Sequence, residues 1–444
     1  MFRPSNGASE FRSTRVSPQQ ILEESTTRKK GRKDDQGDLY WTQSRAGRRS
    51  QRYGCLILLV GIIAGSLMGG MRIGLELLSY YKDQGKYCLV MEDNFDGPLN
   101  TTLWQHEVSV GGNGNGEFQW DQASPQNSYT EDGNLYIVPT LTADVIGEAN
   151  IYDGYTVNLT ADGTCTQKES KWTEIDRKIP MQIAINSTHT NCQAHSNATL
   201  GTVIPPVRSA RLTTKGTAAI RYGRVEVRAR MPTGDWLWPA VWMMPRDAVY
   251  GDWPRSGEID IFESDGNKPT WRYDVHSNSM RSTLHFGYDP DHNLQRKWGG
   301  IRLLWRKYFN EDYHTFGLEW DEHGIWTWER SRNYRVLNKK FKNFAIDREP
   351  VQRDKNGVLI PPPNPWLLSN SKAAPFDQYF YLILNVAVGS TNGYFANSPW
   401  SNSDPNAARA FIEAKDHTWG PTWPQDPKKR GMAIDYVKMW QRCG

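Results

Sequence analysis

The chain has 444 residues, enough for more than one domain, and 38% of them are hydrophobic. The net charge of +4 is uneven: residues 1–54 hold twelve Lys or Arg and six Asp or Glu, which leaves −2 for the rest. Nucleic-acid binding by the larger part is therefore excluded, because it lacks a basic surface. The 19 tryptophans are informative, since flat aromatic rings stack well on sugar faces, although many of them could simply fill a sheet core.

An apolar segment follows the basic tail. Cys55 to Met71 has no charged residue over 17 positions, and as a helix it spans roughly 26 Å, enough for a thin bilayer. We expect a disordered cytoplasmic tail (1–52), a transmembrane signal anchor (53–75) and a stalk (76–87). Arginines before the apolar segment place the N-terminus in the cytoplasm. A buried core helix is the alternative, whereas a cleaved signal peptide is disfavoured by the late start.

The predicted topology is that of a single-pass type II membrane protein, with its C-terminal part in the secretory lumen or at the cell surface. Acceptor sequences for N-glycosylation agree with this topology, because all four lie beyond the apolar segment, at Asn100, Asn158, Asn186 and Asn197. Small residues recur every four positions on one face of the apolar helix, at Gly61, Gly65 and Gly69. Such a face would also permit a homodimer.

Four of the five cysteines lie beyond the apolar segment. An even number in an oxidising compartment suggests two disulfides, for which three pairings are open. We favour Cys165–Cys192, which closes a polar loop, and Cys88–Cys443, which joins the two ends of the domain. Free buried thiols are the alternative.

Beyond the stalk, the sequence is typical of an all-β domain over residues 88–443, with 144–206 as a glycosylated loop excursion. Apolar and polar side chains alternate over 222–231 (YGRVEVRARM), as expected of a half-buried strand. Other strands are predicted at 135–141, 282–286, 315–320, 325–329, 379–388 and 433–440, with a turn at 321–324. One helix is predicted at 405–415, with Asp404 as its N-cap. Many short strands indicate a sandwich or jelly roll.

Candidate catalytic residues lie in WPRSGEIDIFESDGN, residues 253–267. Glu258 and Asp260 are two residues apart, so a strand points both side chains to one face. A regular strand would turn Glu263 away, but one extra residue near 261–262, a β-bulge, would bring it back. A solvated acidic edge is the alternative. However, three unpaired carboxylates on a half-buried strand are costly unless function retains them.

These segments resemble glycoside hydrolase family 16, in particular its laminarinase-like and β-1,3-glucan recognition protein-like branch. The resemblance covers residues 88–443 in the family's order, through YGRVEVRARMPTGDWLWPAVWMMP (222–245), GDWPRSGEIDIFES (251–264), STLHFG (282–287), FGLEW (316–320), FYLILNVAVG (380–389) and IDYVKMW (434–440). A membrane anchor before such a domain is similar to fungal members. The resemblance implies an all-β jelly-roll sandwich of two curved antiparallel sheets with a concave substrate cleft, preceded by one transmembrane helix.

The resemblance also implies roles for the three acids: Glu258 as nucleophile, Glu263 as general acid/base, and Asp260 as the residue that orients Glu258. Clustered carboxyl groups push their pKa values apart, so one stays ionised while another stays protonated. The implied activity is retaining hydrolysis of β-1,3- or mixed-linkage glucan through a glycosyl-enzyme intermediate. Retaining enzymes need carboxyl groups about 5–5.5 Å apart. Because five residues of strand span roughly 16 Å, the bulge and sheet curvature must close the gap.

For substrate contacts the resemblance implies Trp242 and Trp253, with His285 near the catalytic centre and Asn385 as a further candidate. Trp242 could instead be a core residue, His285 could bond a carbonyl, and Asn385 could satisfy buried backbone.

The expected partners are therefore a β-glucan and a membrane, without nucleic acid. No cofactor or metal site is expected, since the histidines lack paired ligand spacing. Some family members carry a structural calcium, but the sequence gives no position for one. The rival functions are a non-catalytic glucan-binding or wall-assembly protein and a transglycosylase on the same fold.

Overall fold

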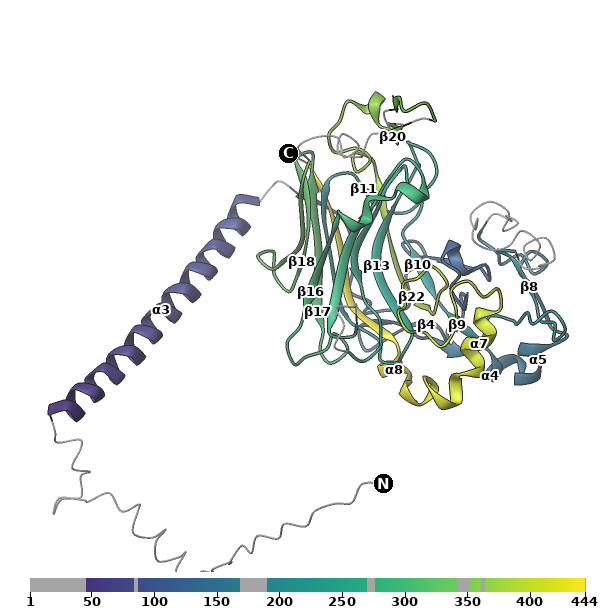
Figure 1. The fold of residues 1–444 in the computed structure, drawn as a ribbon, viewed down its shortest axis with the longest axis horizontal. Coiled ribbons are helices and arrows are strands. Elements are labelled where there is room, and N and C mark those ends of the chain that lie inside the picture. The colour runs from purple at the N-terminus through teal and green to yellow at the C-terminus, as the bar shows by residue number, and fades with distance from the viewer. Residues whose placement is uncertain are drawn as a thin grey trace, which may run out of the picture. The chain divides into compact units, whose positions relative to one another are not determined.

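The computed structural model describes residues 45–83, 87–167, 190–269, 276–341, 352–353, 355–360 and 364–443. The chain divides into two units, residues 1–82 and 83–444. A long helix, α3 (Arg45–Asp83), characterises the first unit, and a β-sandwich forms most of the second (Figure 1).

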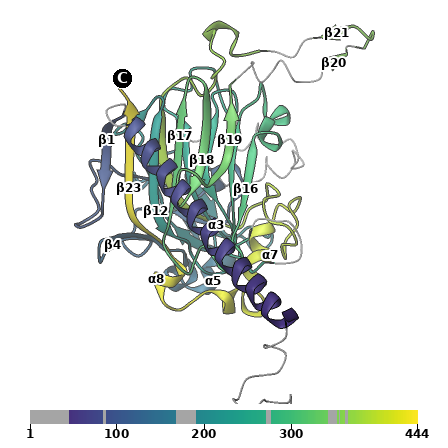
Figure 2. The ribbon, with the colours of Figure 1, turned by 90° about the vertical axis from the view of Figure 1, so that its left-hand side faces the viewer.

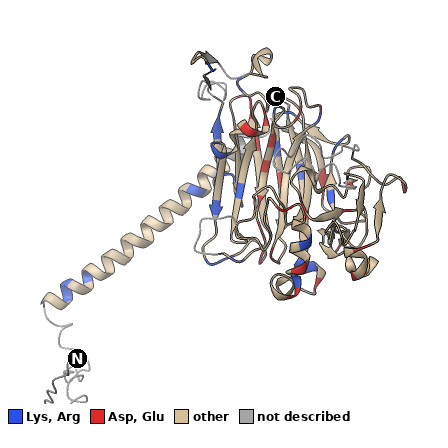
Figure 3. Ribbon diagram, turned by 45° about the vertical axis from the view of Figure 1, so that its right-hand side comes forward, with Lys and Arg blue, Asp and Glu red and all other residues tan. Residues whose placement is uncertain are grey.

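Helix α3 is 39 residues long, and by length and composition its part from Arg45 to Leu75 could cross a membrane. Basic residues mark its beginning and recur toward its end, with a long uncharged stretch between them (Figure 3). The predicted disorder of residues 45–52 is wrong, because they are helical, and the same helix continues through residues 76–83 of the expected stalk. Once an apolar helix is nucleated, adding flanking residues to it is favourable, and Arg, Gln and Leu are good helix formers.

The first sheet of the sandwich has the strand order β19-β18-β17-β12-β23-β5-β4, and β1 also pairs with β23. All of its strand pairs are antiparallel, and Figure 2 shows most of them side by side. The strands are β1 (Tyr87–Asp93), β4 (Ser128–Glu131), β5 (Asn134–Ile137), β12 (Gly223–Arg230), β17 (His314–Asp321), β18 (Gly324–Glu329), β19 (Arg335–Lys340) and β23 (Met432–Arg442).

The second sheet has the order β16-β15-β14-β13-β22-β10-β2, and β11 also pairs with β22. It is antiparallel throughout. The strands are β2 (Gln105–Glu107), β10 (Arg211–Thr213), β11 (Ala219–Ile220), β13 (Leu237–Pro245), β14 (Glu258–Glu263), β15 (Ser279–His285), β16 (Gly299–Leu303) and β22 (Phe380–Val388).

Smaller elements surround the sandwich. Three short sheets are present among the described residues. One pairs β9 (Val207–Ser209) with β3 (Gln119–Asp121) and β6 (Thr140–Leu141), and the others pair β7 (Thr156–Asn158) with β8 (Gln193–His195) and β20 (Gln352–Arg353) with β21 (Leu359–Ile360). Short α-helices are α4 (Ala143–Ile146), α5 (Glu148–Tyr152), α7 (Ala407–Glu413) and α8 (Pro427–Arg430). The 3₁₀ turns are η1 (Gly112–Gly114), η2 (Pro290–His292), η3 (Leu294–Arg296), η5 (Leu367–Ser369), η6 (Lys415–His417) and η7 (Gly420–Thr422).

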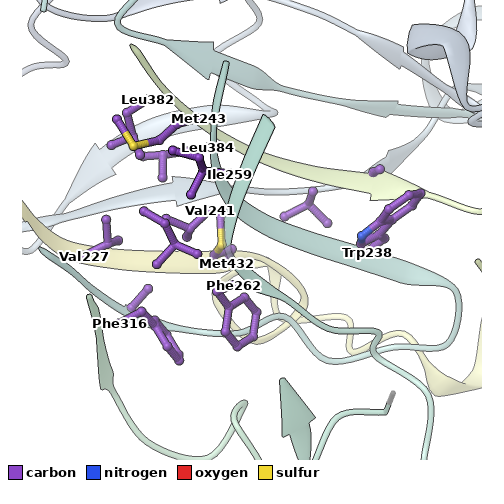
Figure 4. Close-up of a cluster of buried hydrophobic side chains, with 14 of the residues drawn as sticks. Val227, Trp238, Val241, Met243, Ile259, Phe262, Phe316, Leu382, Leu384 and Met432 are labelled. Atoms are coloured by element: carbon purple, nitrogen blue, oxygen red, sulfur yellow. The ribbon is translucent and has the colours of Figure 1, made fainter. Parts of the chain in front are cut away.

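The hydrophobic core lies between the two sheets (Figure 4). Val241 and Ile259 from the second sheet and Val227 and Phe316 from the first are all fully buried in it. Burying each such side chain contributes roughly 1.5–3 kcal/mol. Because successive side chains of a strand alternate between faces, the outer face of the second sheet is left for polar and aromatic residues. Trp238 lies apart from the central group in Figure 4.

Two predicted elements differ in detail from the structure. The expected strand at 135–141 is two strands, β5 and β6, in different sheets. Pro139 lies between them, and proline has no N–H to donate to a ladder. The expected helix at 405–415 covers Ala407–Glu413, and its N-cap position is Asn406. Asp404 was wrongly predicted as the N-cap, because its side chain accepts from the Asn406 N–H in a turn before the helix.

The region 144–206 is more ordered than a loop excursion where it is described. It contains α5, β7 and β8, and these elements bury a small cluster of their own that includes Ile151, Val157 and Ala194. Two of the predicted glycosylation acceptors in the described residues, Asn100 and Asn158, are exposed and Asn197 is half-buried. Asn186 lies outside the described residues.

Two disulfides join the cysteines in the pairing favoured by the sequence. Cys88 and Cys443 connect the beginning of β1 to the end of β23, with Cα atoms 5.8 Å apart. Cys165 and Cys192 close the chain segment between β7 and β8. The first bond therefore fastens the two ends of the sandwich to each other.

Candidate active site

Strand β14 presents three carboxyl groups on one face of the second sheet. Glu258 pairs with His285, and Asp260 pairs with Thr283. Between Asp260 and Glu263 the register with β15 shifts by one residue, and the register with β13 shifts at the same place. This is the predicted β-bulge, and it is confirmed. Glu263 pairs with Arg281 and so joins the other two acids on what we call the carboxyl face.

The bulge also shortens the distance along the strand. Glu258 and Glu263 are five residues apart on β14, but their partners on β15, His285 and Arg281, are four residues apart. Four residues of strand span roughly 13 Å, compared with roughly 16 Å for five. Two long glutamate side chains therefore have less distance to bridge.

Glu258 and Asp260 form a coupled pair with His285. Asp260 is only 2% exposed, and burial, followed by the adjacent charge of Glu258 and a hydrogen bond to it, raises the Asp260 pKa well above its ordinary value. His285 Nε2 lies 3.1 Å from Asp260 Oδ2 and 3.9 Å from Glu258 Oε1. The other Glu258 oxygen, Oε2, accepts from Trp253 Nε1 at 2.8 Å. Asp260 is thus a proton donor toward Glu258.

Glu263 is held as a neutral acid at neutral pH. The side chain is 9% exposed, and burial, with the nearby charge of Asp260, raises the Glu263 pKa to about 8. His285 and Arg281, both on β15, lower the Glu263 pKa and so act in the opposite direction. Trp238 Nε1 donates to Glu263 Oε1 at 3.1 Å. The ring of Trp238 is itself fixed by stacking on Tyr394, with centroids 3.9 Å apart.

Farther across the sheet, Trp242 and Asn385 contact each other. Trp242 Nε1 donates to Asn385 Oδ1 at 2.7 Å. The guanidinium of Arg211 lies over the Trp242 ring, 4.7 Å from its centroid, and Arg211 pairs with Glu107 at 2.5 Å. These four residues extend the polar surface from β14 through β13 and β22 to β10 and β2.

A cation could fit among some of these groups by distance alone. Glu258, Asp260 and His285 each offer one ligand atom, and these atoms lie within 4.8 Å of one another. Metal binding requires deprotonated ligands. Burial and the adjacent charge of Glu258 raise the pKa of Asp260 and so disfavour the deprotonated form that a cation would bind. The geometry therefore fits proton transfer better than metal binding.

The structure brings together Glu258, Asp260, Glu263, Trp253 and His285 as the sequence predicted. Trp253 is 42% exposed and bonds Glu258, so part of its ring is open to solvent. Trp242 and Asn385 lie farther along the same face and bind each other.

Two residues beside Glu263, Trp238 and Arg281, were not predicted. A signal for Trp238 was present, because it is four residues from Trp242 on an alternating strand and so shares its face. Arg281 is likewise four residues from His285 on β15. The identity of their acidic partners depended on the strand register, which the sequence does not reveal.

The fold is a jelly-roll β-sandwich with a cluster of carboxyl groups and tryptophans on one sheet face. The family model of the glycosyl hydrolases family 16 matches residues 179–350. A β-1,3-glucan-binding protein of Penaeus monodon is 38% identical over 363 residues, which cover 80% of this chain and 90% of that protein. A glucan endo-1,3-β-glucosidase of Cryptopygus antarcticus is 29% identical, covering 80% of this chain and 93% of that protein.

Among solved structures, the laminarinase of Rhodothermus marinus matches 81% of this chain and 98% of its own, with 23% identity and a TM-score of 0.47. The sequence likeness to the Penaeus monodon protein extends over most of both chains. The chain belongs to glycosyl hydrolase family 16.

Proposed function

We propose that this chain is a retaining endo-glycosidase that cleaves β-1,3- or mixed-linkage glucan. The observation that carries the proposal is the placement of Glu258, Asp260 and Glu263 on one face, with Glu263 protonated at neutral pH. A carboxyl pair of this kind supplies the nucleophile and the acid that double displacement needs. The chemistry needs no cofactor.

In the first step, the Glu258 carboxylate attacks the anomeric carbon while Glu263 donates its proton to the glycosidic oxygen. The bond from that carbon to the leaving sugar breaks, and an ester forms between the glycosyl group and Glu258. Asp260 donates a hydrogen bond to Glu258, which holds the attacking carboxylate in position. Trp253 donates to the other Glu258 oxygen and restricts its rotation further.

In the second step, ionised Glu263 accepts a proton from an incoming hydroxyl, which attacks the anomeric carbon and releases Glu258. When the hydroxyl belongs to water, the result is hydrolysis, and when it belongs to another sugar, the result is transglycosylation. Two inversions at the same carbon give net retention of configuration. Both outcomes use the same residues in the same roles.

A second candidate function is glucan binding without turnover. The Penaeus monodon relative, 38% identical, is a β-1,3-glucan-binding protein by name. On this alternative Trp253 and Trp242 would bind the polymer, and the three acids would be retained without chemistry. The presence of all three acids, with a partner for each, favours the enzyme.

The test is incubation of the full chain in detergent with laminarin and with a mixed-linkage glucan, followed by analysis of the products. Glu258→Gln and Glu263→Gln should each lower turnover at least about 10³-fold, because each removes a group that acts as the nucleophile or the acid–base catalyst. A matched control is Glu311→Gln, away from the carboxyl face. Glucan binding without any product from the wild-type chain would refute the enzyme and support the binding protein.

We also propose that α3 anchors the domain in a membrane, with the domain on the lumenal or outer side. The exposed sequons Asn100 and Asn158 lie in the domain and not in the tail. In a eukaryotic host, peptide-N-glycosidase should lower the apparent mass of the chain, and Asn100→Gln with Asn158→Gln should remove part of that shift. An unmodified chain in the membrane fraction would contradict this topology.

A further inference from the structure

His285 is held by a residue outside the strands. Its Nδ1 lies 2.8 Å from the side-chain Nδ2 of Asn293, which follows η2 and precedes η3. On the opposite side of the ring, Nε2 faces the oxygens of Asp260 and Glu258. The imidazole therefore connects Asn293 to the carboxyl pair.

The orientation of the Asn293 amide is fixed by backbone groups. Its Oδ1 accepts from the Gln295 N–H at 3.2 Å and from the Phe286 N–H at 3.3 Å. An oxygen must occupy that position, so the amide nitrogen is the atom that faces His285. Leu294 N also donates to Phe286 O at 2.8 Å, which fastens the loop to the end of β15.

The amide in turn fixes the position of the proton on His285. An amide nitrogen can only donate, so His285 Nδ1 must accept and carries no hydrogen. In neutral imidazole the single hydrogen is then on Nε2, the nitrogen that lies 3.1 Å from Asp260 Oδ2 and 3.9 Å from Glu258 Oε1. In the reverse tautomer, the Nδ1–H of His285 would face the Asn293 amide, which is also a donor. The lone pair on Nε2 would then face the oxygens of Glu258 and Asp260.

We propose that Asn293 is a positioning residue that keeps the hydrogen of neutral His285 on Nε2, where it faces Glu258 and Asp260. This inference rests on the proposed function of the carboxyl face. Through His285, Asn293 keeps an N–H group close to the pair that must bear the negative charge of the nucleophile. No substrate contact by Asn293 is required.

The charged groups that face His285 are few in the described part of the chain. From β14 they are Glu258, Asp260 and Glu263. On its own strand, Arg281 is four residues away, beside Glu263. Trp253 lies near the ring, with centroids 5.9 Å apart, and is uncharged.

Asn293→Asp separates positioning from a merely structural role. A carboxylate oxygen can still accept from the Gln295 and Phe286 N–H groups, so the loop is preserved. Toward His285, however, the carboxylate accepts where the amide donated, and neutral imidazole then carries its hydrogen on Nδ1.

The experiment compares glucan turnover by the full-length wild type and Asn293→Asp. The variant should lower kcat roughly 10- to 100-fold, the range typical of losing a partner that orients a functional histidine. KM should change less than kcat. A kcat within about twofold of the wild type would overturn the proposal and leave Asn293 as a loop residue.

A second readout does not depend on activity. Long-range ¹H–¹⁵N spectra of ¹⁵N-histidine-labelled protein, assigned with His285→Gln, report which ring nitrogen bears hydrogen. The wild type should show protonated Nε2 and bare Nδ1, and Asn293→Asp should show a protonated Nδ1. A wild-type ring with hydrogen on Nδ1 would overturn the proposal. If the wild type turns over no glucan, the proposed function fails while this spectrum still decides the inference.

Discussion

The burial of Glu263 makes a quantitative prediction about stability. Its pKa is raised from an ordinary 4.5 to about 8, chiefly by burial, and each unit corresponds to about 1.4 kcal/mol. Between pH 4.5 and about 8, the folded chain therefore keeps a proton on Glu263 that the unfolded chain has lost. Wild-type stability should fall by up to about 5 kcal/mol as pH rises from 4.5 to 8.

Glu263→Gln removes this titration while keeping the size of the side chain. The variant should therefore gain stability relative to the wild type as pH rises from 4.5 to 8, and the gain should level off above 8. Urea unfolding of the full chains in detergent, followed by tryptophan fluorescence at several pH values, measures the difference. A functional acid that weakens its own fold is the expected compromise at an active site.

A suitable control is Glu92→Gln on β1. Glu92 is exposed and its hydrogen bond to Lys438 lowers its pKa, so its titration lies below pH 4.5. The stability difference between this variant and the wild type should not change between pH 5 and 9. A difference for Glu263→Gln that is equally flat would refute the claim that Glu263 is a buried acid.

Trp238→Phe should remove a donor that favours the ionised form of Glu263, so the Glu263 pKa should rise. The alkaline limb of the pH–rate profile should then shift to higher pH by roughly one unit. Trp242→Phe removes an equivalent indole N–H that bonds Asn385, and a shift of the same size in that variant would contradict the assignment. Replacing Cys88 and Cys443 by serine opens a loop of 355 residues, compared with 27 for the other disulfide. Because a longer loop gains more chain entropy on opening, removing Cys88–Cys443 should lower the free energy of unfolding by about 2 kcal/mol more than removing Cys165–Cys192. Equal decreases for the two variants in denaturant unfolding would contradict this.

Much of the sandwich could be predicted because alternation marks a half-buried strand. The pattern at 222–231 predicted β12, which covers Gly223–Arg230. The strand at 135–141 was not resolved into two, because the apolar run continues up to Pro139 while the partner strand changes. Pairing is a tertiary property that one segment does not encode.

The candidate site could be predicted as far as it lies in one segment. The spacing of Glu258, Asp260 and Glu263 required a bulge, and the bulge is present. Asn293 could not be predicted, because its role depends on a loop that returns to the end of β15. Polar side chains in such loops have no periodicity, so only the folded contacts show which partner each one takes.

The central claim is that Glu258 forms a covalent bond to the substrate. The most direct measurement is intact and peptide mass spectrometry after incubation with a 2-deoxy-2-fluoro laminaribiosyl reagent carrying a good leaving group. The fluorine slows both the formation and the breakdown of the glycosyl-enzyme. The good leaving group speeds its formation again, so the glycosyl-enzyme accumulates. We predict one added glycosyl group per chain, on the peptide that contains Glu258. Turnover of glucan without this adduct, or an adduct on another residue, would contradict the account.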